Sequence, residues 1–305
     1  MGMSLRIMVV GTCCIVSAVA ALLADPVAPL SAQQARDEVK IGMMNNLFEE
    51  QDEKKIRVQI EPFAALVRRQ TGTKGDFVVV NGRERMVEDL KANRVQMGVM
   101  HGLDYAWIRD QLMETRPLLI AVADTTTLKA ALVVPKDSSV QSVADLKKQT
   151  LALNAYPPYH VRYWLNHICD GDYAGFFKVV TQRDVEAAME EVADKSAAAT
   201  AVSNGALEFY KRQKPVRFQR FFRVLMESPD FPAPVMIYRT GQVRPELVQR
   251  FRTSMLSAHE TPEGRDTLQL WRLKRFLDVP ADYDRLAEET AKRFPPPSEP
   301  ARPKP

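Results

Sequence analysis

The stretch DFVVVNGRERMVEDLKANRVQMGVM, residues 76–100, places a helical pattern between two short apolar runs. DFVVV and VQMGVM predict buried strands, because strands covered on both faces are continuously apolar. Between them, Met86, Val87 and Leu90 fall on one face of a predicted helix. Upstream, EVKIGMM (38–44) predicts a strand and EPFAALVRRQTG (61–72) predicts a helix. This β-α-β-α-β order is typical of a parallel sheet covered by helices.

The alternation then restarts, which predicts a second unit of the same kind. Further strands are expected at 117–123, 129–137, 151–153, 177–180 and 229–240, and further helices at 138–150, 158–168, 184–194 and 205–213. After Val243 the pattern is helical throughout, over 244–261, 263–276 and 281–294. The chain crosses between the units near Ala123–Leu128 and again near Ser228–Pro234. We therefore expect an α/β fold of two lobes, each a mainly parallel sheet covered by helices, with hinges at the two crossings.

The ends of the chain carry separate signals. Arg6 precedes an apolar run at 7–23, and small and turn residues follow it, as in a secretory signal peptide. An uncleaved membrane anchor is the alternative, because the run is nearly long enough to span a bilayer. The expected domains are a signal peptide at 1–32, lobe one at 33–124 and 232–293, lobe two at 125–231, and a Pro-rich disordered tail at 294–305. The protein is then exported, and periplasmic in a bacterium with two membranes.

Composition limits the function classes. The 305 residues carry a net charge of +4 without a compact Lys/Arg block, which argues against a nucleic-acid partner. Cys13 and Cys14 lie in the predicted signal, so the exported chain keeps only Cys169 and has no internal disulfide. Because Cys169 falls on the apolar side of a predicted helix, we expect a buried, unreactive thiol.

The expected ligand site follows from the chain order. In open α/β sheets, ligands bind beyond the carboxyl ends of the strands. The loops at those ends are 45–48, 81–83, 101–105, 154–160 and 203–204. Within them, the candidate ligand-binding side chains are Asn45, Asn46, Phe48, His101, Asp104, Tyr105, Tyr156, Tyr159, His160, Ser203 and Asn204.

The sequence YPPYH, residues 156–160, joins a strand to a helix. A rigid turn explains the two prolines, and Pro158 suits the first helical position. Tyr156, Tyr159 and His160 either complete that turn or face the cleft, where a ring and a hydroxyl can contact an apolar, cationic or anionic group. In the loop after residue 100, local capping by His101 and Asp104 is the structural alternative to ligand contact.

Motifs for catalysis and cofactors are missing from the sequence. It has no G-x-S-x-G, no P-loop and no G-x-G-x-x-G, and we expect neither a cofactor nor catalysis. The main alternative role for the histidines is a metal site formed by His101, Asp104, His160 and His167. Their spacing matches no compact ligand motif, so we expect no metal.

Several blocks together resemble a known family. The blocks are KIGMM (40–44), FAALVRRQTG (63–72), DLKANRVQMGVMHGLDYAWI (89–108), ALVVPKDSSVQSVADLKKQTLAL (131–153) and PAPVMIYRTGQVRPELVQRFRTSML (232–256). In order and spacing the chain is similar to a class II periplasmic substrate-binding protein of phosphate, phosphite or phosphonate ABC importers. The resemblance covers nearly the whole mature chain. It implies ligand contact at His101, Gly102, Asp104 and Tyr105 and in the loop at 154–160.

The resemblance also implies where this chain departs from its relatives. In the family, the loop corresponding to 154–160 is usually rich in Ser and Thr with a Gly, and it holds an oxyanion at a helix N-terminus. Here Pro157 and Pro158 stand in that loop and lack N–H groups. The expected function is an exported solute-binding protein with an altered pocket, serving an ABC importer permease or a membrane sensor. The alternatives are a sensor or protein-interaction domain without transport, or an enzyme on this fold.

Overall fold

The computed structural model describes residues 39–48, 53–72, 75–123 and 125–297. The predicted signal peptide at 1–32 lies outside the described residues, as does the tail from residue 298 onward. Within the described chain, two main sheets and a two-stranded sheet are present. The first sheet with its helices is called lobe one below, and the second is called lobe two.

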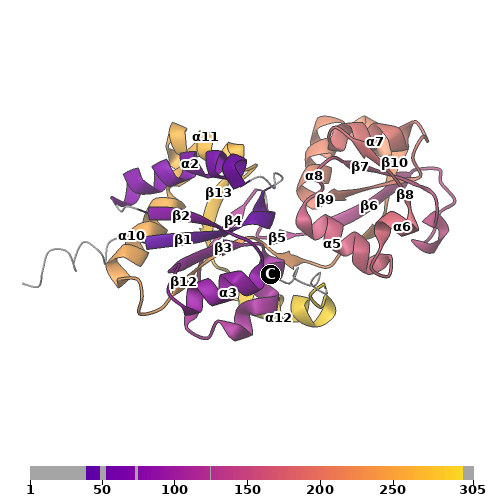
Figure 1. The fold of residues 1–305 in the computed structure, drawn as a ribbon. Helices are drawn as coiled ribbons and strands as arrows, with labels where there is room; N and C mark the ends of the chain where they lie inside the picture. Colours follow the sequence, from indigo (N-terminus) through magenta and orange to yellow (C-terminus); the bar gives the residue numbers. More distant parts are fainter. Residues whose placement is uncertain (1–38, 49–52, 73–74, 124, 298–305) are drawn as a thin grey trace, which may run out of the picture. The chain divides into compact units, whose positions relative to one another are not determined.

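Lobe one is a six-stranded sheet with helices on both faces (Figure 1). Its strands, in spatial order, are β13 (Arg275–Asp278), β4 (Thr115–Val122), β12 (Val235–Arg239), β3 (Met97–Met100), β1 (Val39–Met44) and β2 (Gly75–Val80). Its helices are α2 (Glu53–Thr71), α3 (Arg83–Lys91), α4 (Gly102–Ile108), α10 (Pro245–Leu256), α11 (Pro262–Leu270) and α12 (Tyr283–Arg293). One apolar core joins the sheet to α2, α10 and α11, and a second core joins it to α3, α4 and α12. The predicted apolar face of Met86, Val87 and Leu90 is buried in the second core.

Lobe two repeats this plan with five strands. Their spatial order is β10 (Phe222–Glu227), β6 (Ala130–Pro135), β9 (Ala199–Ser203), β7 (Thr150–Asn154) and β8 (Lys178–Gln182). Its helices are α5 (Tyr159–Ile168), α6 (Tyr173–Phe176), α7 (Val185–Ala193), α8 (Asn204–Gln213) and α9 (Pro215–Phe221). Helix α5 packs on one face, and α7 packs on the other (Figure 1). Cys169 is buried beside α5 as expected, and burial raises the pKa of its thiol to about 11.

Both sheets are mixed, although most strands of each sheet run in the same direction. Strands β1, β2 and β3 are parallel, but β12 lies antiparallel between β3 and β4. In lobe two, β6 lies antiparallel between β9 and β10. Each inserted strand is the first one that the chain forms after a crossing. The chain enters each sheet from the hinge side, so this strand runs against its two neighbours; the edge strand β13 is also antiparallel to β4.

The two crossings lie side by side and form the two-stranded sheet. Strand β5 (Thr127–Leu128) pairs antiparallel with β11 (Phe231–Pro232). The Thr127 hydroxyl donates to the Asp230 carboxylate at 2.6 Å, which ties the strands together. The predicted crossings at 123–128 and 228–234 contain these two strands.

Two predicted helices differ in the structure. The segment 263–276 forms α11 only as far as Leu270, and β13 follows it. Arg272 has φ of +56°, a left-handed conformation that ends a helix. The segment 138–150 holds only a short 3₁₀ turn, Ala144–Leu146, before which the Ser142 N–H donates to Asp145 at 2.9 Å.

Residues 294–297 are held in the fold, which corrects part of the expected disordered tail. The Phe294 ring is only 2% exposed and lies in the core of lobe two, 4.9 Å from the Phe231 ring. Trp107 Nε1 donates to the Phe294 carbonyl at 2.7 Å, and the Tyr163 hydroxyl donates to the Pro295 carbonyl. The aromatic side chain at the end of α12 therefore anchors a segment that its prolines alone would leave extended.

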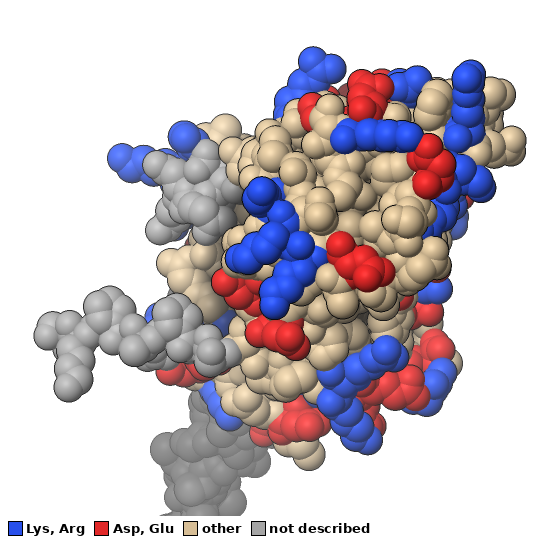
Figure 2. Space-filling view, turned by 90° about the vertical axis from the view of Figure 1, so that its right-hand side faces the viewer, with Lys and Arg blue, Asp and Glu red and all other residues tan. Residues whose placement is uncertain are grey.

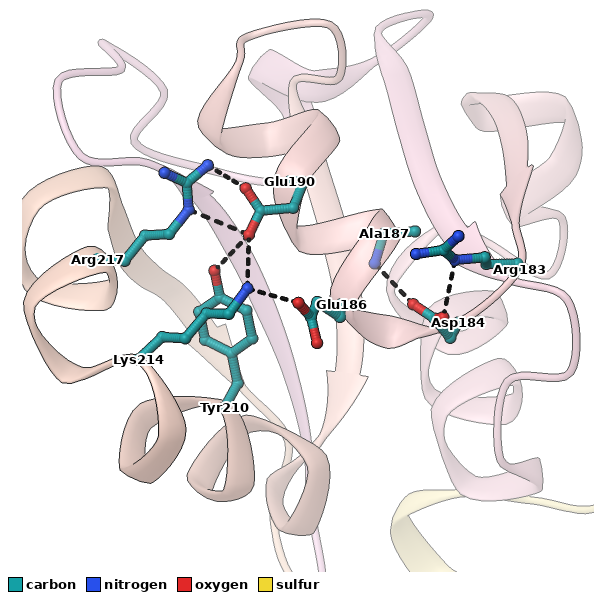
Figure 3. Close-up of polar contacts among 8 residues, drawn as sticks. All are labelled: Arg183, Asp184, Glu186, Ala187, Glu190, Tyr210, Lys214 and Arg217. Carbon is teal, nitrogen blue, oxygen red and sulfur yellow. Dashed lines mark hydrogen bonds and ion pairs between the residues drawn. The ribbon is translucent and has the colours of Figure 1, made fainter.

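Glu190 on α7 is the centre of a charged network in lobe two (Figure 3). It accepts hydrogen bonds from Tyr210 and Arg217 Nε at 3.0 Å each, and Lys214 lies 3.5 Å away. Burial opposes ionisation of Glu190, but these hydrogen bonds and charges together lower its pKa. The face of the molecule in Figure 2 shows Lys and Arg side chains interspersed with Asp and Glu.

Candidate functional site

Three chain segments meet where the expected site lies. Strand β1 is followed by a 3₁₀ turn, Asn45–Leu47, and β3 is followed by His101, which is the N-cap residue of α4. From lobe two, the N-terminal residue of α5 is Tyr159. The structure brings together four predicted site residues from these segments: Asn46, His101, Asp104 and Tyr159.

His101 is fixed by the main chain of the neighbouring loop. Its Nε2 lies 3.0 Å from the carbonyl oxygen of Asn46. A carbonyl can only accept, so Nε2 carries the hydrogen and Nδ1 keeps its lone pair. Burial lowers the pKa of His101 to about 4 and outweighs the hydrogen bond to Asn46. The imidazole is therefore neutral at pH 7 and presents an acceptor.

Asp104 is a buried acid with an incomplete set of partners. Its side chain is fully buried, and its Oδ2 accepts a hydrogen bond from Asn46 Nδ2 at 2.9 Å. The other oxygen, Oδ1, and the side-chain oxygen of Asn46 are buried without a hydrogen-bond donor among the described residues. Burial raises the pKa of Asp104 to about 6, although the Asn46 hydrogen bond and the charge of Arg83 lower it. A buried carboxylate oxygen without a donor is costly and is a natural position for a ligand.

Tyr159 brings lobe two to this cluster. Its ring stacks on His101, with centroids 5.1 Å apart and planes inclined by 24°. The edge of Trp107 lies 6.5 Å away, and the guanidinium of Arg162 lies 5.9 Å from the ring centre. Burial and the charge of Asp104 raise the pKa of the Tyr159 hydroxyl, which therefore stays protonated at neutral pH.

His160 points to the hinge. It is 6% exposed, and its Nε2 donates to the carbonyl of Lys129, just after β5, at 3.2 Å. Burial lowers its pKa to about 3, which keeps it neutral. The structure also moves the start of the helix by one residue, because Pro158 is the N-cap of α5 and not its first residue. Pro158 thus removes the N–H of the N-cap, while Pro157 lies outside the helix.

The remaining predicted side chains are placed apart from the cluster. Phe48 is buried in the core against Trp271, and the Tyr105 hydroxyl donates to Asp284 at 2.7 Å. Tyr156 is 58% exposed. Asn45 lies half-buried in the turn after β1.

At the start of α8 and at Gly102, the predicted residues serve the hinge region. The Ser203 hydroxyl accepts from the Ala206 N–H and caps α8. Asn204 Oδ1 accepts from the Lys129 N–H at 3.1 Å. A Cβ atom on Gly102 would lie only 2.1 Å from the Pro232 carbonyl oxygen of β11.

Sequence reasoning gave little or no weight to three residues that the structure places beside Tyr159. The Trp107 ring packs partly against the cores of both lobes, and it also contacts the Tyr163 ring at 5.0 Å and the Arg83 guanidinium at 5.0 Å. Tyr163 and Arg162 follow Tyr159 by four and three residues, so they share its helix face. That spacing is the signal that could have found them.

The cluster is suited to binding through lone-pair acceptors and aromatic faces. It contains a carboxylate, an amide oxygen and an imidazole lone pair. A group of three or more His, Cys, Asp or Glu suited to a metal is not found in the described part of the chain. In the same residues, no helix has both the length and the apolar character of a membrane span.

Comparison with known proteins identifies the family. The model of the periplasmic substrate-binding protein of phosphonate ABC transporters matches residues 47–284. No curated protein sequence matches the chain. Members of this family bind small ligands for transport, which makes it a family of exported transport proteins and not of enzymes.

Solved structures share the fold. XAC2383 from Xanthomonas citri, bound to chloride in one structure and to ATP in another, is 18% identical and has TM-scores of 0.56 and 0.55. PhnD1 from Prochlorococcus marinus, in complex with methylphosphonate, is 14% identical with a TM-score of 0.55. These likenesses cover 85% of this chain and 97–98% of those chains. They show the two-lobed fold of periplasmic binding proteins, and the family match over 47–284 shows that the chain belongs to the periplasmic substrate-binding proteins of phosphonate-type ABC transporters.

Proposed function

We propose that this protein is an exported solute-binding protein that closes its lobes on a small ligand and delivers it to an ABC importer. The ligand contacts Asn46, His101 and Asp104 of lobe one and Tyr159 of lobe two. The observation that supports this proposal is the stacking of Tyr159 on His101, together with a buried carboxylate oxygen, Asp104 Oδ1, that has no donor among the described residues. The pocket is altered relative to the family pattern, because prolines replace the hydroxyl residues of the α5 loop.

The proposed hinge is the pair β5 and β11. These two strands make up the two-stranded sheet between the lobes, and each is two residues long. A ligand that binds the closed arrangement more tightly shifts the population toward it. We place lobe one at 33–124 and 232–293 and lobe two at 125–231, with the signal peptide at 1–32 removed on export.

A thermal-shift screen of the purified protein tests this function. Phosphate, methylphosphonate, sulfonates, amines and small organic acids are added at millimolar concentration, because a ligand that binds only the folded state raises the melting temperature. We expect at least one compound to raise it, and Tyr159→Ala to abolish that rise. Tyr156→Ala is the matched control, since this tyrosine of the same loop is exposed and should leave the rise intact. If no compound stabilises the protein and an isolated partner protein does, the transport function is wrong.

A further inference from the structure

The acceptors of the site have no donor opposite them. Asp104 Oδ1 and the side-chain oxygen of Asn46 are both buried and lack a hydrogen-bond partner within the described residues. The two side chains are already joined through Asn46 Nδ2 and Asp104 Oδ2, so the free oxygens belong to one connected group. Buried acceptors of this kind are rare in native proteins and call for a partner from outside the chain.

His101 is joined to this group through the main chain of Asn46. Its Nε2–H is committed to the Asn46 carbonyl, which leaves the Nδ1 lone pair. Asn46 thus orients His101 through its main chain and Asp104 through its side chain. The two buried oxygens, Asp104 Oδ1 and Asn46 Oδ1, are acceptors, and a deprotonated oxyanion has no donor to offer them.

The carboxylate also lacks a cation. Arg83 is the basic residue whose charge acts on Asp104, but its guanidinium lies 3.4 Å from Glu84, 3.3 Å from the Pro297 carbonyl and 5.0 Å from the Trp107 ring centre. Among the ion pairs of residues 39–48, 53–72, 75–123 and 125–297, none includes Asp104. The Tyr159 ring stacks on His101, and the Arg162 guanidinium lies 5.9 Å from its centre without forming an ion pair with Asp104 among the described residues.

We propose that the ligand of this site carries a protonated amine, whose N–H groups donate to Asp104, to the Asn46 side-chain oxygen and to His101 Nδ1. An ammonium group has three donors and one positive charge, which matches three acceptors and one unpaired carboxylate. The carbon atoms of the ligand lie against Tyr159 and Trp107. This inference rests on the proposed function, and it names the chemical class of the ligand that the cleft holds.

Matched probes test the ligand class by calorimetry on the whole purified protein. Propylamine and ethanolamine are compared with propanol and ethylene glycol, in which a hydroxyl replaces the amine, and with inorganic phosphate and methylphosphonate. We expect the amines to bind and the hydroxyl analogues to bind about tenfold or more weakly, since hydrogen bonds to charged groups dominate such contacts. Asp104→Asn keeps the shape and removes the charge, and it should weaken amine binding about ten- to hundredfold.

A measurement on the unaltered protein covers the case in which Asp104→Asn does not fold. Amine affinity should fall as the pH is lowered from 7 to 5, because the carboxylate becomes protonated. The other titratable and charged groups of this cluster are Arg83 and Glu84 of α3, His101, and Tyr159 and Arg162 of α5. Of these, Tyr159 keeps its proton and His101 stays neutral across this pH range.

The outcomes separate the two proposals. Oxyanion binding that depends on Tyr159, without amine binding, would overturn the amine ligand and leave the solute-binding function intact. Amine binding that is unchanged by Asp104→Asn and by pH would also overturn it. If none of the probes binds and the broader screen finds no Tyr159-dependent ligand, both proposals are wrong.

Discussion

The ring of Tyr159, at the start of α5, lies on the imidazole of His101, at the end of β3, with the two centroids 5.1 Å apart. Lobe two thereby covers a side chain of lobe one whose pKa is low because it is buried. The pKa of His101 should therefore depend on whether the Tyr159 ring is stacked on it.

Tyr159→Ala should raise the pKa of His101 from about 4 toward the ordinary value of 6.5, because water reaches the uncovered ring. An NMR titration of the imidazole carbon-bound protons measures this pKa. Tyr156→Ala, in the same loop, should leave it unchanged. Equal pKa values in all three proteins would show that the burial of His101 does not come from Tyr159.

Gly102→Ala should destabilise the protein by about 3 kcal/mol, because the new Cβ would meet the Pro232 carbonyl oxygen at 2.1 Å. The clash is with main chain of β11, which cannot move without disturbing the hinge strands. Gly72→Ala is the control: Gly72 has φ of +68° and open space around it, so the cost should be about 1 kcal/mol of backbone strain. Urea unfolding measures both, and equal losses would contradict the role given to the close approach.

His160 should make stability depend on pH. Its pKa is about 3 in the folded protein and 6.5 ordinarily, so between these values the unfolded chain binds more protons. The free energy of unfolding therefore falls as the pH is lowered, by about 2 kcal/mol between pH 6.5 and pH 5 from this residue alone. His160→Gln should remove that part of the slope. His101 and Asp104 titrate in both proteins and cancel in the comparison, so parallel stability curves would rule out a buried neutral His160.

Phe294→Ala should lower the free energy of unfolding by about 3 kcal/mol, because the ring is 2% exposed within the core of lobe two. Phe209→Ala removes the same side chain from a position that is 58% exposed and should change stability by about 0.5 kcal/mol or less. Chemical denaturation followed by tryptophan fluorescence compares them. Similar losses from the two variants would mean that Phe294 does not anchor the end of the chain.

The sequence was sufficient for the order of the elements because each apolar run is short and each helix has one apolar face. Local pattern could not place β13, since 263–276 keeps helical spacing through Arg272, where a left-handed residue ends the helix. The local sequence pattern also could not predict the direction of each strand in its sheet. The inserted positions of β6 and β12 depend on where the chain re-enters a sheet, which is a property of the whole topology.

The site was predicted at the level of loops and only in part at the level of side chains. Asn46 and Asp104 are 58 residues apart, and no periodicity links them. The motif YPPY does not distinguish its two tyrosines as ligand-binding candidates. In the structure, Tyr159 is the first residue of α5 and is partly buried, whereas Tyr156 precedes the helix and is exposed. Phe48 follows a strand as a ligand residue would, but its apolar ring is more stable in the core with Trp271.

The inserted strand β12 imposes an order on synthesis and folding. Lobe two is a continuous segment of the chain, so all its strands are available before β12 leaves the ribosome. Lobe one cannot complete its sheet at that stage, because β12 pairs with both β3 and β4, with Val235 opposite Met100. Strands β3 and β4 therefore lack their shared neighbour until the entire second lobe has been synthesised. Folding of lobe one is therefore governed by a late, long-range closure, which slows the completion of the native protein relative to a chain of the same length with local pairing.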